Sequence, residues 1–393
     1  MKRLYRVSID TLITSIIPII SWFLLGKILR NDLINVFTVT YPLQCITGII
    51  NAIFGVGANI SEYKDNNKNS ADNGIFYGII FSLFIYGIVV INIDKYISFM
   101  NLDVSIYKVF TTYSAIQIML NTILSLITTK LYYENKNKES NKISLIFNII
   151  NFIVLTLMAI ITKNEILTVA TTLVLLSLLL LVIIVKNIKN IDFKLNIKNC
   201  IKYDSSSLCM SFMFFLIYFF GFSNSFNYGE KYVLAITFVT LITDMQWDIK
   251  GAIDTVAKID IAKKDFNYIE HRKNACKLVA ILISSIFVIG IITYPLYKPD
   301  LKITGIFVFL HIVNFIIEPF YTIKEDWLQL EVSASKTTLN KFIAFLIRNI
   351  VCFMPTPFCT ILGQMASCSY EFIYSNINYK THKKQMKNSN IAI

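Results

Sequence analysis

The chain has 393 residues, of which 55% are hydrophobic and only 16% are charged, and its mean hydropathy is +0.59. Because soluble domains carry about 25% charged residues, this composition argues against a soluble enzyme and against a disordered or fibrous protein. A helix needs roughly 20 apolar residues to cross a bilayer. The length therefore predicts an all-α polytopic membrane protein with about twelve transmembrane helices.

Apolar segments separated by polar breaks predict these helices in chain order. We place them at residues 9–29, 36–60, 74–93, 105–129, 143–162, 166–185, 205–223, 232–257, 274–294, 303–323, 342–355 and 358–375. Between the last two, Pro355 and Pro357 must interrupt the helix, since proline lacks a backbone donor and clashes with the preceding turn. The basic N-terminus resembles a signal peptide, but its apolar segment is too long and has no small-residue cleavage site. We expect an uncleaved first helix.

Lys and Arg are distributed unevenly between alternate loops. With the N-terminus inside, the segments that face the cytoplasm hold 26 of these residues and the outer segments hold 6. Basic residues collect on the cytoplasmic side of membrane proteins. The asymmetry therefore predicts a multi-pass protein of the cell (inner) membrane with both termini in the cytoplasm. It also explains the net charge of +12 without nucleic acid as a partner.

A short internal match divides the helices into two halves. At an offset of 200 residues, six of the seventeen positions in 51–67 are identical to those in 251–267. Many transporters consist of two such halves. We predict an N-terminal six-helix lobe at 1–187, a basic cytoplasmic linker at 188–204, a pseudo-symmetric C-terminal six-helix lobe at 205–376 and a basic cytoplasmic tail at 377–393. The alternating apolar and basic residues of the linker are typical either of an interfacial helix held by anionic lipid or of a solvated connection.

Several kinds of site find no support in the sequence. The seven Cys residues form no Cys-x-x-Cys pair, and the three His residues have no carboxylates at ligand spacing, so we predict no metal centre. The sequence contains no Gly-Lys-Ser/Thr motif, which argues against ATP hydrolysis. We predict a protein that is not an enzyme and that uses no cofactor except a coupling sodium ion or proton.

Two regions carry a family resemblance. Residues 21–61 contain Gly26 near the end of the first helix, Pro42 in the second, and the small-residue stretch NAIFGVGANIS; residues 113–151 place an Asn in the fifth helix after a basic loop. In these features the chain resembles the multidrug and toxic compound extrusion (MATE) family, in the larger group that includes polysaccharide and oligosaccharide-lipid flippases. The resemblance implies an exporter of organic or cationic small molecules that works by alternating access, driven by sodium or protons. We expect it to be a monomer.

The chain departs from this family in two regions that matter for ion coupling. The ion-coupled members of the family resemble one another in an acidic residue a few positions before the Gly of the first helix. The matching region near Ser21 has no carboxylate, and neither has the segment 205–223. Two alternatives therefore remain. One is a flippase for a lipid-linked saccharide or lipid precursor, whose cavity should be ringed by Arg and Lys. The other is a non-transporting MATE-like membrane partner.

The clearest group of intramembrane charges lies in the predicted helix 232–257. Asp244 and Asp248 are four residues apart and share a face, and Lys250 and Asp254 follow with the same spacing. Ionisable groups inside a span are costly and normally face the interior of the bundle. We predict that Asp244 and Asp248 bind sodium or share a proton, and that Asp254 lies beside Lys250. The alternative is a helix that leaves the membrane early, so that these groups are solvated.

A second candidate face lies in the predicted helix 303–323. His311, Asn314 and Glu318 follow one another at steps of three and four residues. Pro319 lacks a backbone donor and so leaves a carbonyl free to help coordinate a cation. We predict that these side chains line the transport cavity. The alternative is a kinked helix with Glu318 at the cytoplasmic interface.

Amide side chains form two further pairs in the first half of the chain. Gln117 and Asn121 lie four residues apart, and Asn148 and Asn151 lie three apart. Such residues more often hydrogen-bond neighbouring helices than bind substrate, but we keep them as candidate cavity residues. The aromatic run at 218–226 predicts a belt at the outer interface rather than a site for aromatic cations.

Overall fold

The computed structural model describes residues 17, 19–65, 68–134, 136–246, 249–250, 253, 257 and 267–389. In this part of the chain the backbone forms two compact units. The N-terminal unit comprises Ile17–Asn227, and the C-terminal unit comprises the described residues of Tyr228–Ile393.

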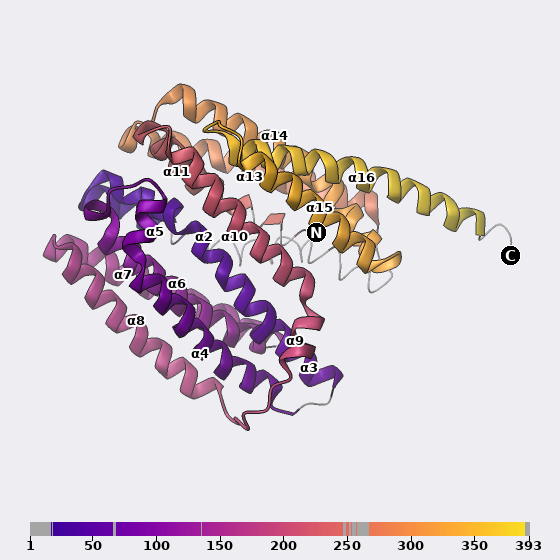
Figure 1. Ribbon diagram of the computed structural model, residues 1–393, viewed down its shortest axis with the longest axis horizontal. Helices are drawn as coiled ribbons and strands as arrows, with labels where there is room; N and C mark the ends of the chain where they lie inside the picture. The colour runs from indigo at the N-terminus through magenta and orange to yellow at the C-terminus, as the bar shows by residue number, and fades with distance from the viewer. Residues whose placement is uncertain are drawn as a thin grey trace. The chain divides into compact units, whose positions relative to one another are not determined.

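The N-terminal unit is a bundle of helices around one central helix (Figure 1). Its elements are the apolar helix Ile19–Ile28, η1 (Asn31–Ile34), α2 (Asn35–Ile50), the π-helix η2 (Asn51–Gly57), α3 (Ala58–Lys64), α4 (Ser70–Ile91), α5 (Ile93–Phe99), α6 (Val104–Tyr133), α7 (Asn137–Thr162), α8 (Glu165–Asn187), α9 (Ile197–Tyr203) and α10 (Ser205–Phe226). α6 packs against α2, α4, α7 and α8, so it forms the middle of the bundle. α10 packs along α2 and therefore belongs to this unit. The division into lobes at 1–187 and 205–376 stays a prediction.

The C-terminal unit is built on long helices. They are α11 (Glu230–Thr243), α13 (Tyr268–Tyr297), α14 (Leu301–Glu331), α15 (Ala334–Cys352) and α16 (Cys359–Ser389). α14, α15 and α16 pack against one another, and α11 and α13 both pack against α14. α14 is therefore the helix that most of this unit surrounds.

Each of the twelve predicted spans contains helix among the described residues. Eight of the described helices are long and apolar enough to cross a membrane. α15 ends at Cys352 and α16 begins at Cys359, so the helix is interrupted where the two prolines predicted an interruption. α14 extends eight residues beyond its predicted end at 323, and the predicted tail continues α16 as helix to Ser389.

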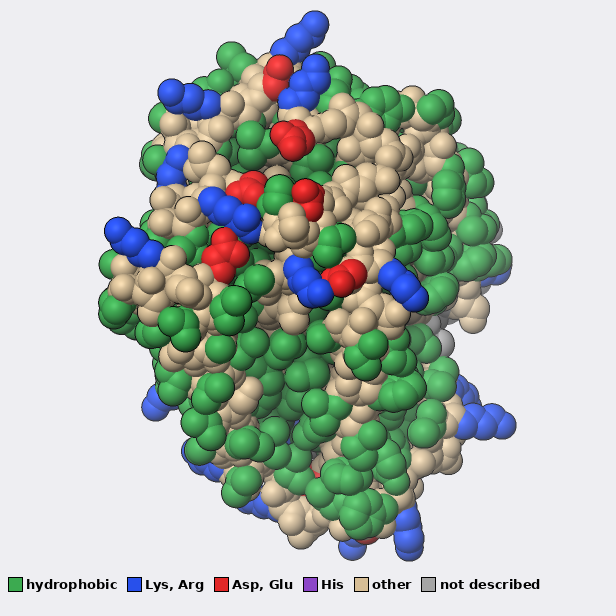
Figure 2. Space-filling view, turned by 60° about the vertical axis from the view of Figure 1, so that its left-hand side comes forward, with side chains coloured by type: hydrophobic (Ala, Val, Ile, Leu, Met, Phe, Trp, Pro, Cys, Tyr) green, Lys and Arg blue, Asp and Glu red, His purple; other side chains and the backbone are tan. Residues whose placement is uncertain are grey.

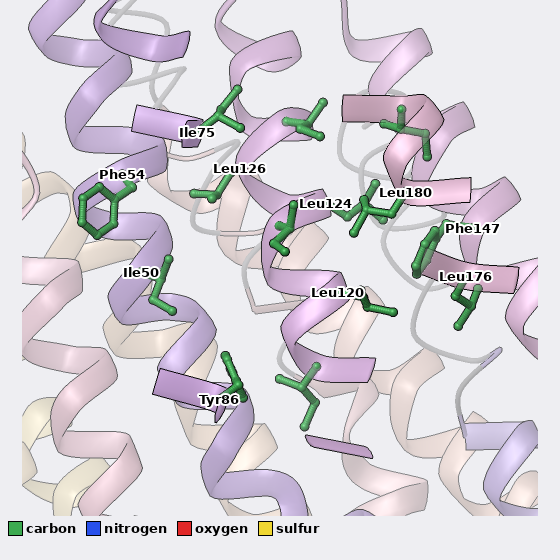
Figure 3. Packing of buried hydrophobic residues seen from close by; sticks show 14 of the residues in the cluster. Ile50, Phe54, Ile75, Tyr86, Leu120, Leu124, Leu126, Phe147, Leu176 and Leu180 are labelled. Atoms are coloured by element: carbon green, nitrogen blue, oxygen red, sulfur yellow. The ribbon is translucent and has the colours of Figure 1, made fainter. Parts of the chain in front are cut away.

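The apolar side chains face both inward and outward. In the N-terminal unit, Phe54, Tyr86 and Leu124 belong to a buried cluster that joins α2, η2, α4, α6, α7 and α8 (Figure 3). Other apolar side chains point outward, such as Ile91 and Val185, which are 83% and 80% exposed. Broad hydrophobic areas on the surface are visible in Figure 2. Lipid tails solvate such side chains as well as a protein core does, so this pattern is that of a multi-pass membrane protein.

Small residues bring the helices of the N-terminal unit into close contact around η2. A Cβ atom on Gly57 would lie 2.3 Å from the Cys200 carbonyl oxygen, and one on Gly74 would lie 2.4 Å from the Phe54 carbonyl oxygen. Asn59 donates a hydrogen bond of 2.8 Å to the Gly55 carbonyl and so satisfies one backbone acceptor of the π-helix. The glycines of the NAIFGVG stretch and of α4 therefore permit close helix packing, as small residues do in membrane bundles.

The segment between α8 and α9, which we call the strap (residues 188–196), is docked on α4. The Asn73 amide oxygen accepts hydrogen bonds from the backbone N–H groups of Asp192 and Phe193, at 3.1 and 3.2 Å. Its amide nitrogen donates to the Asp192 carboxylate and to the Lys194 carbonyl. The Tyr77 hydroxyl donates to the Phe193 carbonyl at 2.9 Å. The strap is not helical. Side chains of α4 hold its backbone in place by hydrogen bonds, so it is not a flexible linker.

An ion pair beside the strap joins α4 to α6. Lys130 Nζ lies 2.5 Å from Asp72 Oδ1, and the two side chains are only 12% and 9% exposed. Asp72 also accepts from the Asn190 backbone N–H at 3.3 Å, and Lys130 donates to the Asn187 carbonyl at 3.1 Å. The pair thus fixes the end of α8 and the start of the strap.

Candidate functional site

Buried polar side chains gather on three helices of the C-terminal unit. Each of the following is at most 9% exposed: Asn314, Glu318, Glu325 and Asp326 of α14, Asn340 and Arg348 of α15, and Gln364 and Glu371 of α16. Burying charged groups inside a membrane protein is costly, so such residues usually serve a function. This group is the strongest candidate site in the described part of the chain.

Glu318 and Lys250 form the ion pair of this site. Lys250 Nζ lies 3.4 Å from Glu318 Oε1, with side-chain exposures of 31% and 8%. The Cys368 thiol donates to the same carboxylate oxygen at 3.9 Å, and the Tyr321 hydroxyl lies 3.3 Å from the Cys368 sulfur. The ammonium also lies 5.9 Å from the centre of the Tyr321 ring, within range of a cation–π interaction. Glu371 is a second buried carboxylate near the same Lys250 and Tyr321.

A cavity of about 20 Å³ opens beside this pair. Its polar lining consists of Gln246, Lys250, Glu318 and Thr322, and the rest is apolar. Gln246 Oε1 and Thr322 Oγ1 are buried and have no hydrogen-bond partner among the described residues. Both amide atoms of Asn314, one turn before Glu318, are in the same situation. A space of this size holds one water molecule or one bare cation, and the side-chain oxygens of Gln246 and Thr322, which line it, are available as ligands.

The polar cluster continues along α14 toward its C-terminal end. The Asn340 amide donates to Glu325 Oε1 at 3.4 Å. Lys324 Nζ donates to Asn376 Oδ1 and lies 5.3 Å from the centre of the Tyr268 ring. No group of three or more His, Cys, Asp or Glu side chains suited to a metal ion occurs among the described residues.

The buried residues beyond position 323 were not predicted, because the predicted helix ends at that position whereas α14 continues to Glu331. Residues 324–341 lie between two predicted helices, in a segment that the predicted topology places on the cytoplasmic side. Glu318, Tyr321 and Glu325 nevertheless repeat at steps of three and four residues, which is the pattern of one helical face. That pattern could have extended the helix and revealed the buried stripe.

The predicted site on the helix 232–257 is described only in part. Asp244 is half-buried and directly follows α11. Asp248 and Asp254 lie outside the described residues. Lys250, predicted beside Asp254, lies next to Glu318 of α14. The sodium or proton site at Asp244 and Asp248 therefore stays a prediction.

The three residues predicted on one face of α14 differ in their surroundings. Asn314 and Glu318 are 0% and 6% exposed. His311 is half-buried, and the centre of its ring lies 5.8 Å from that of Phe315. The carboxylate of Glu318 is thus enclosed by protein, and the alternative that places it at the cytoplasmic interface stays open.

The amide residues of the N-terminal unit act mainly within and between helices. The Asn151 amide oxygen accepts from the Tyr113 hydroxyl at 2.8 Å and thereby joins α7 to α6. Asn148 donates to the Ser144 carbonyl of its own helix at 3.0 Å. Gln117 and Asn121 are half-buried on α6, and their role as cavity residues stays a prediction.

The aromatic run of α10 packs inside the N-terminal unit. Tyr218 lies 4.8 Å from Tyr41 of α2 between ring centres, and Phe219 stacks on Phe99 at 4.4 Å. Phe222 is only 3% exposed. The predicted belt at the outer interface is therefore wrong for these residues, because α10 turns them toward α2 and α5 instead of toward lipid.

No protein-family model matches the sequence, and no curated protein sequence matches it. Solved structures do match. An outward-facing multidrug resistance MATE family transporter of the MOP superfamily aligns with a TM-score of 0.66 and 15% identity, covering 98% of this chain and 96% of the other. An inward-facing MATE family transporter gives 0.64 and 14%, with coverage of 98% and 96%. A MOP superfamily transporter from Pyrococcus furiosus, described by a binding pocket of reverse polarity that suggests a different function, gives 0.61 and 13%, with coverage of 97% and 96%.

These likenesses extend over nearly the whole chain. They show that it has the fold of MATE family transporters, a two-lobe bundle of twelve helices, as the resemblance in the sequence implied. The apolar helices and this fold indicate a multi-pass membrane protein.

Proposed function

We propose that the chain is a secondary transporter that exports organic or cationic small molecules by alternating access. Its fold is that of proteins solved in both inward-facing and outward-facing states. The observation that carries the proposal is the ion pair between the buried Glu318 and the half-buried Lys250, beside a cavity with unpaired polar atoms. A transporter needs a group whose interactions differ between two states of the protein, because a ligand shifts an equilibrium only by its differential affinity.

Glu318 is suited to this role because it has two ways to balance its charge. In the first, its carboxylate pairs with Lys250, as the 3.4 Å distance allows. In the second, the carboxylate takes up a proton, the attraction is lost, and the long Lys250 side chain can turn toward water. We propose that protons drive export through this exchange, and that a cationic substrate benefits from the negative charge of Glu318 and Glu371.

Sodium is the second candidate for the coupling ion. Gln246, whose unpaired oxygen lines the cavity, lies two residues after Asp244. A sodium ion bound by Asp244 and Asp248 would therefore be held by residues next to Gln246 in the sequence. It would not need the carboxylate of Glu318 as a ligand. Proton coupling therefore makes Glu318 essential for transport, whereas sodium coupling makes Asp244 and Asp248 essential.

Export of ethidium from proteoliposomes, under separately imposed proton and sodium gradients, tests the proposal. We expect the proton gradient to drive export and Glu318→Gln to reduce the coupled rate at least tenfold. The matched control is Asp94→Asn, which removes an exposed ion pair with Lys108 at 2.8 Å and should leave the rate within twofold of the native one. Circular dichroism confirms that each variant is folded.

The other outcomes separate the alternatives. Export driven by sodium alone, and lost in Asp244→Asn, would move the coupling site to the helix 232–257. Export at the native rate in Glu318→Gln would refute the role of the pair. No export under either gradient would favour the flippase or the non-transporting partner, which a translocation assay with a fluorescent lipid-linked saccharide distinguishes.

We also propose that both termini are cytoplasmic, as the distribution of basic residues predicts. Lys95 and Lys136 are both exposed and lie in segments assigned to opposite sides. A cysteine at position 95 should react with a membrane-impermeant maleimide in intact cells, and one at position 136 only after permeabilisation. The reverse pattern would reject this orientation.

A further inference from the structure

The strap and α9 expose apolar and basic side chains in alternation. Four apolar side chains are exposed here: Ile191 (37%), Phe193 (60%), Ile197 (47%) and Ile201 (38%). Four lysines of the same segment are exposed as well: Lys194 and Lys198 lie between these residues, and Lys189 and Lys202 lie at either end. Water would solvate the lysines but not the apolar side chains. A bilayer surface satisfies both.

The backbone conformation of Phe193 keeps its side chain exposed. Its φ angle is +61°, a left-handed conformation that bulky residues rarely adopt. Asn73 and Tyr77 hold this conformation by hydrogen bonds to the Phe193 N–H and carbonyl groups. Its ring contacts Phe76, with 5.3 Å between ring centres, and still remains mostly exposed. Strain that the surrounding structure enforces is typical of functional positions.

The charge of this segment is almost purely positive. Asp192 is the only acidic residue in 188–203, and its carboxylate accepts hydrogen bonds from Asn73 and from the Lys194 backbone N–H. None of the four lysines forms an ion pair with a carboxylate of the described residues. Their charges are therefore available to an anionic partner.

The position of the segment identifies that partner. It directly follows α8, an apolar helix long enough to span a membrane, and directly precedes α10, which is another. A segment tied to the ends of two spans lies at the level of the lipid headgroups. Apolar side chains there reach the acyl boundary, and each lysine near the surface strengthens binding to anionic lipid.

We propose that the strap and α9 form a docking surface for the anionic phospholipids of the bilayer that contains the protein. Phe193 and Ile197 insert between the headgroups, and the four lysines contact the lipid phosphates. Asn73 acts as a positioning residue, because it fixes the strap backbone without touching lipid. The proposal does not depend on the transported substrate.

Lipid binding to the purified protein, measured by native mass spectrometry with phosphatidylglycerol and phosphatidylcholine, is the first test. The variant K189Q/K194Q/K198Q/K202Q should bind phosphatidylglycerol at least tenfold more weakly than the native protein. The control K95Q/K163Q/K298Q/K302Q removes the same charge from lysines outside this segment and should change the affinity less than threefold. Equal losses in both variants would overturn the proposal, since they would reflect net charge alone.

Inorganic phosphate distinguishes a lipid surface from a site for a free anion. We expect 20 mM phosphate not to displace phosphatidylglycerol. Displacement by phosphate, or binding of a short RNA with higher affinity than phosphatidylglycerol, would overturn the proposal.

The depth of side chain 193 in the bilayer is a second measure of lipid binding, and it does not depend on the charge of the protein. A nitroxide attached in F193C, within vesicles containing phosphatidylglycerol, should collide more often with oxygen than with a water-soluble nickel reagent. Asn73→Ala should release the strap and shift the label toward the nickel reagent without a change in charge. A label that is fully accessible from water in the native background would refute the insertion of this side chain.

Discussion

The ion pair between Asp72 and Lys130 provides the sharpest test of how the N-terminal unit is held together. Both side chains are nearly buried, at 9% and 12% exposed, and removing one partner of a buried pair costs about 3–5 kcal/mol. Asp72→Asn leaves the ammonium with the Asn187 carbonyl and with Glu134 Oε1 at 3.7 Å, so we expect a loss at the lower end of this range, about 3 kcal/mol. Lys130→Met leaves the carboxylate with the Asn190 N–H and the start of α4. We expect a smaller loss, about 2 kcal/mol.

The double variant D72N/K130M separates the interaction from the two side chains. If the losses were additive, it would lose about 5 kcal/mol; we expect about 3 kcal/mol, because neither charge is then left unpaired, which gives a coupling of about 2 kcal/mol. The assay is reversible unfolding in mixed detergent micelles, followed by circular dichroism. Asp94→Asn is the control, because its exposed pair should contribute less than about 1 kcal/mol. A loss below about 1 kcal/mol for Asp72→Asn would show that water screens the pair and would refute the reasoning.

Two further predictions concern packing and pH. Gly74→Ala should destabilise the N-terminal unit by about 2 kcal/mol in the same assay, because its Cβ would lie 2.4 Å from the Phe54 carbonyl oxygen. Gly305→Ala, with nothing within 4 Å of its Cβ, should be neutral or slightly stabilising; a similar loss in both would refute the packing argument. The hydrogen bond from Asn73 lowers the pKa of Asp192 below its ordinary value, so docking of the strap should be complete above that ordinary pKa. It should weaken as the pH falls through the lowered pKa. Hydrogen exchange of the strap between pH 3 and pH 7 measures this, and Asn73→Ala should abolish the dependence.

The sequence predicted the positions of the helices well because the main determinant is local. Runs of apolar residues long enough to span a bilayer identify helices without tertiary information, and the prolines at 355 and 357 marked the break before α16. The ends were less predictable. α14 runs past its predicted end at 323, and its residues Glu325 and Asp326 are buried. The helical spacing of Glu318, Tyr321 and Glu325 indicates a longer helix, but it does not reveal which neighbouring helices bury that face.

The candidate site was predictable only in part for the same reason. Asn314 and Glu318 were found because they share a face of one helix. The partner of Glu318 could not be found, because Lys250 is 68 residues away in the chain and only packing brings the two together. The same holds for Asn73, whose importance comes from the strap that it binds about 120 residues later.

α16 has a mechanical consequence that follows from its length. Its 31 residues make a rod of about 46 Å, whereas the hydrocarbon of a bilayer is about 30 Å thick. If α16 crosses the bilayer along its normal, as the predicted span 358–375 implies, roughly a third of the rod projects beyond the lipid. If the rod pivots by about 10° at its start, its far end moves by about 8 Å, given this length. A dye attached to the exposed Lys384 would consequently move by several ångströms when α16 tilts slightly. Single-molecule fluorescence could then detect small tilts of this helix.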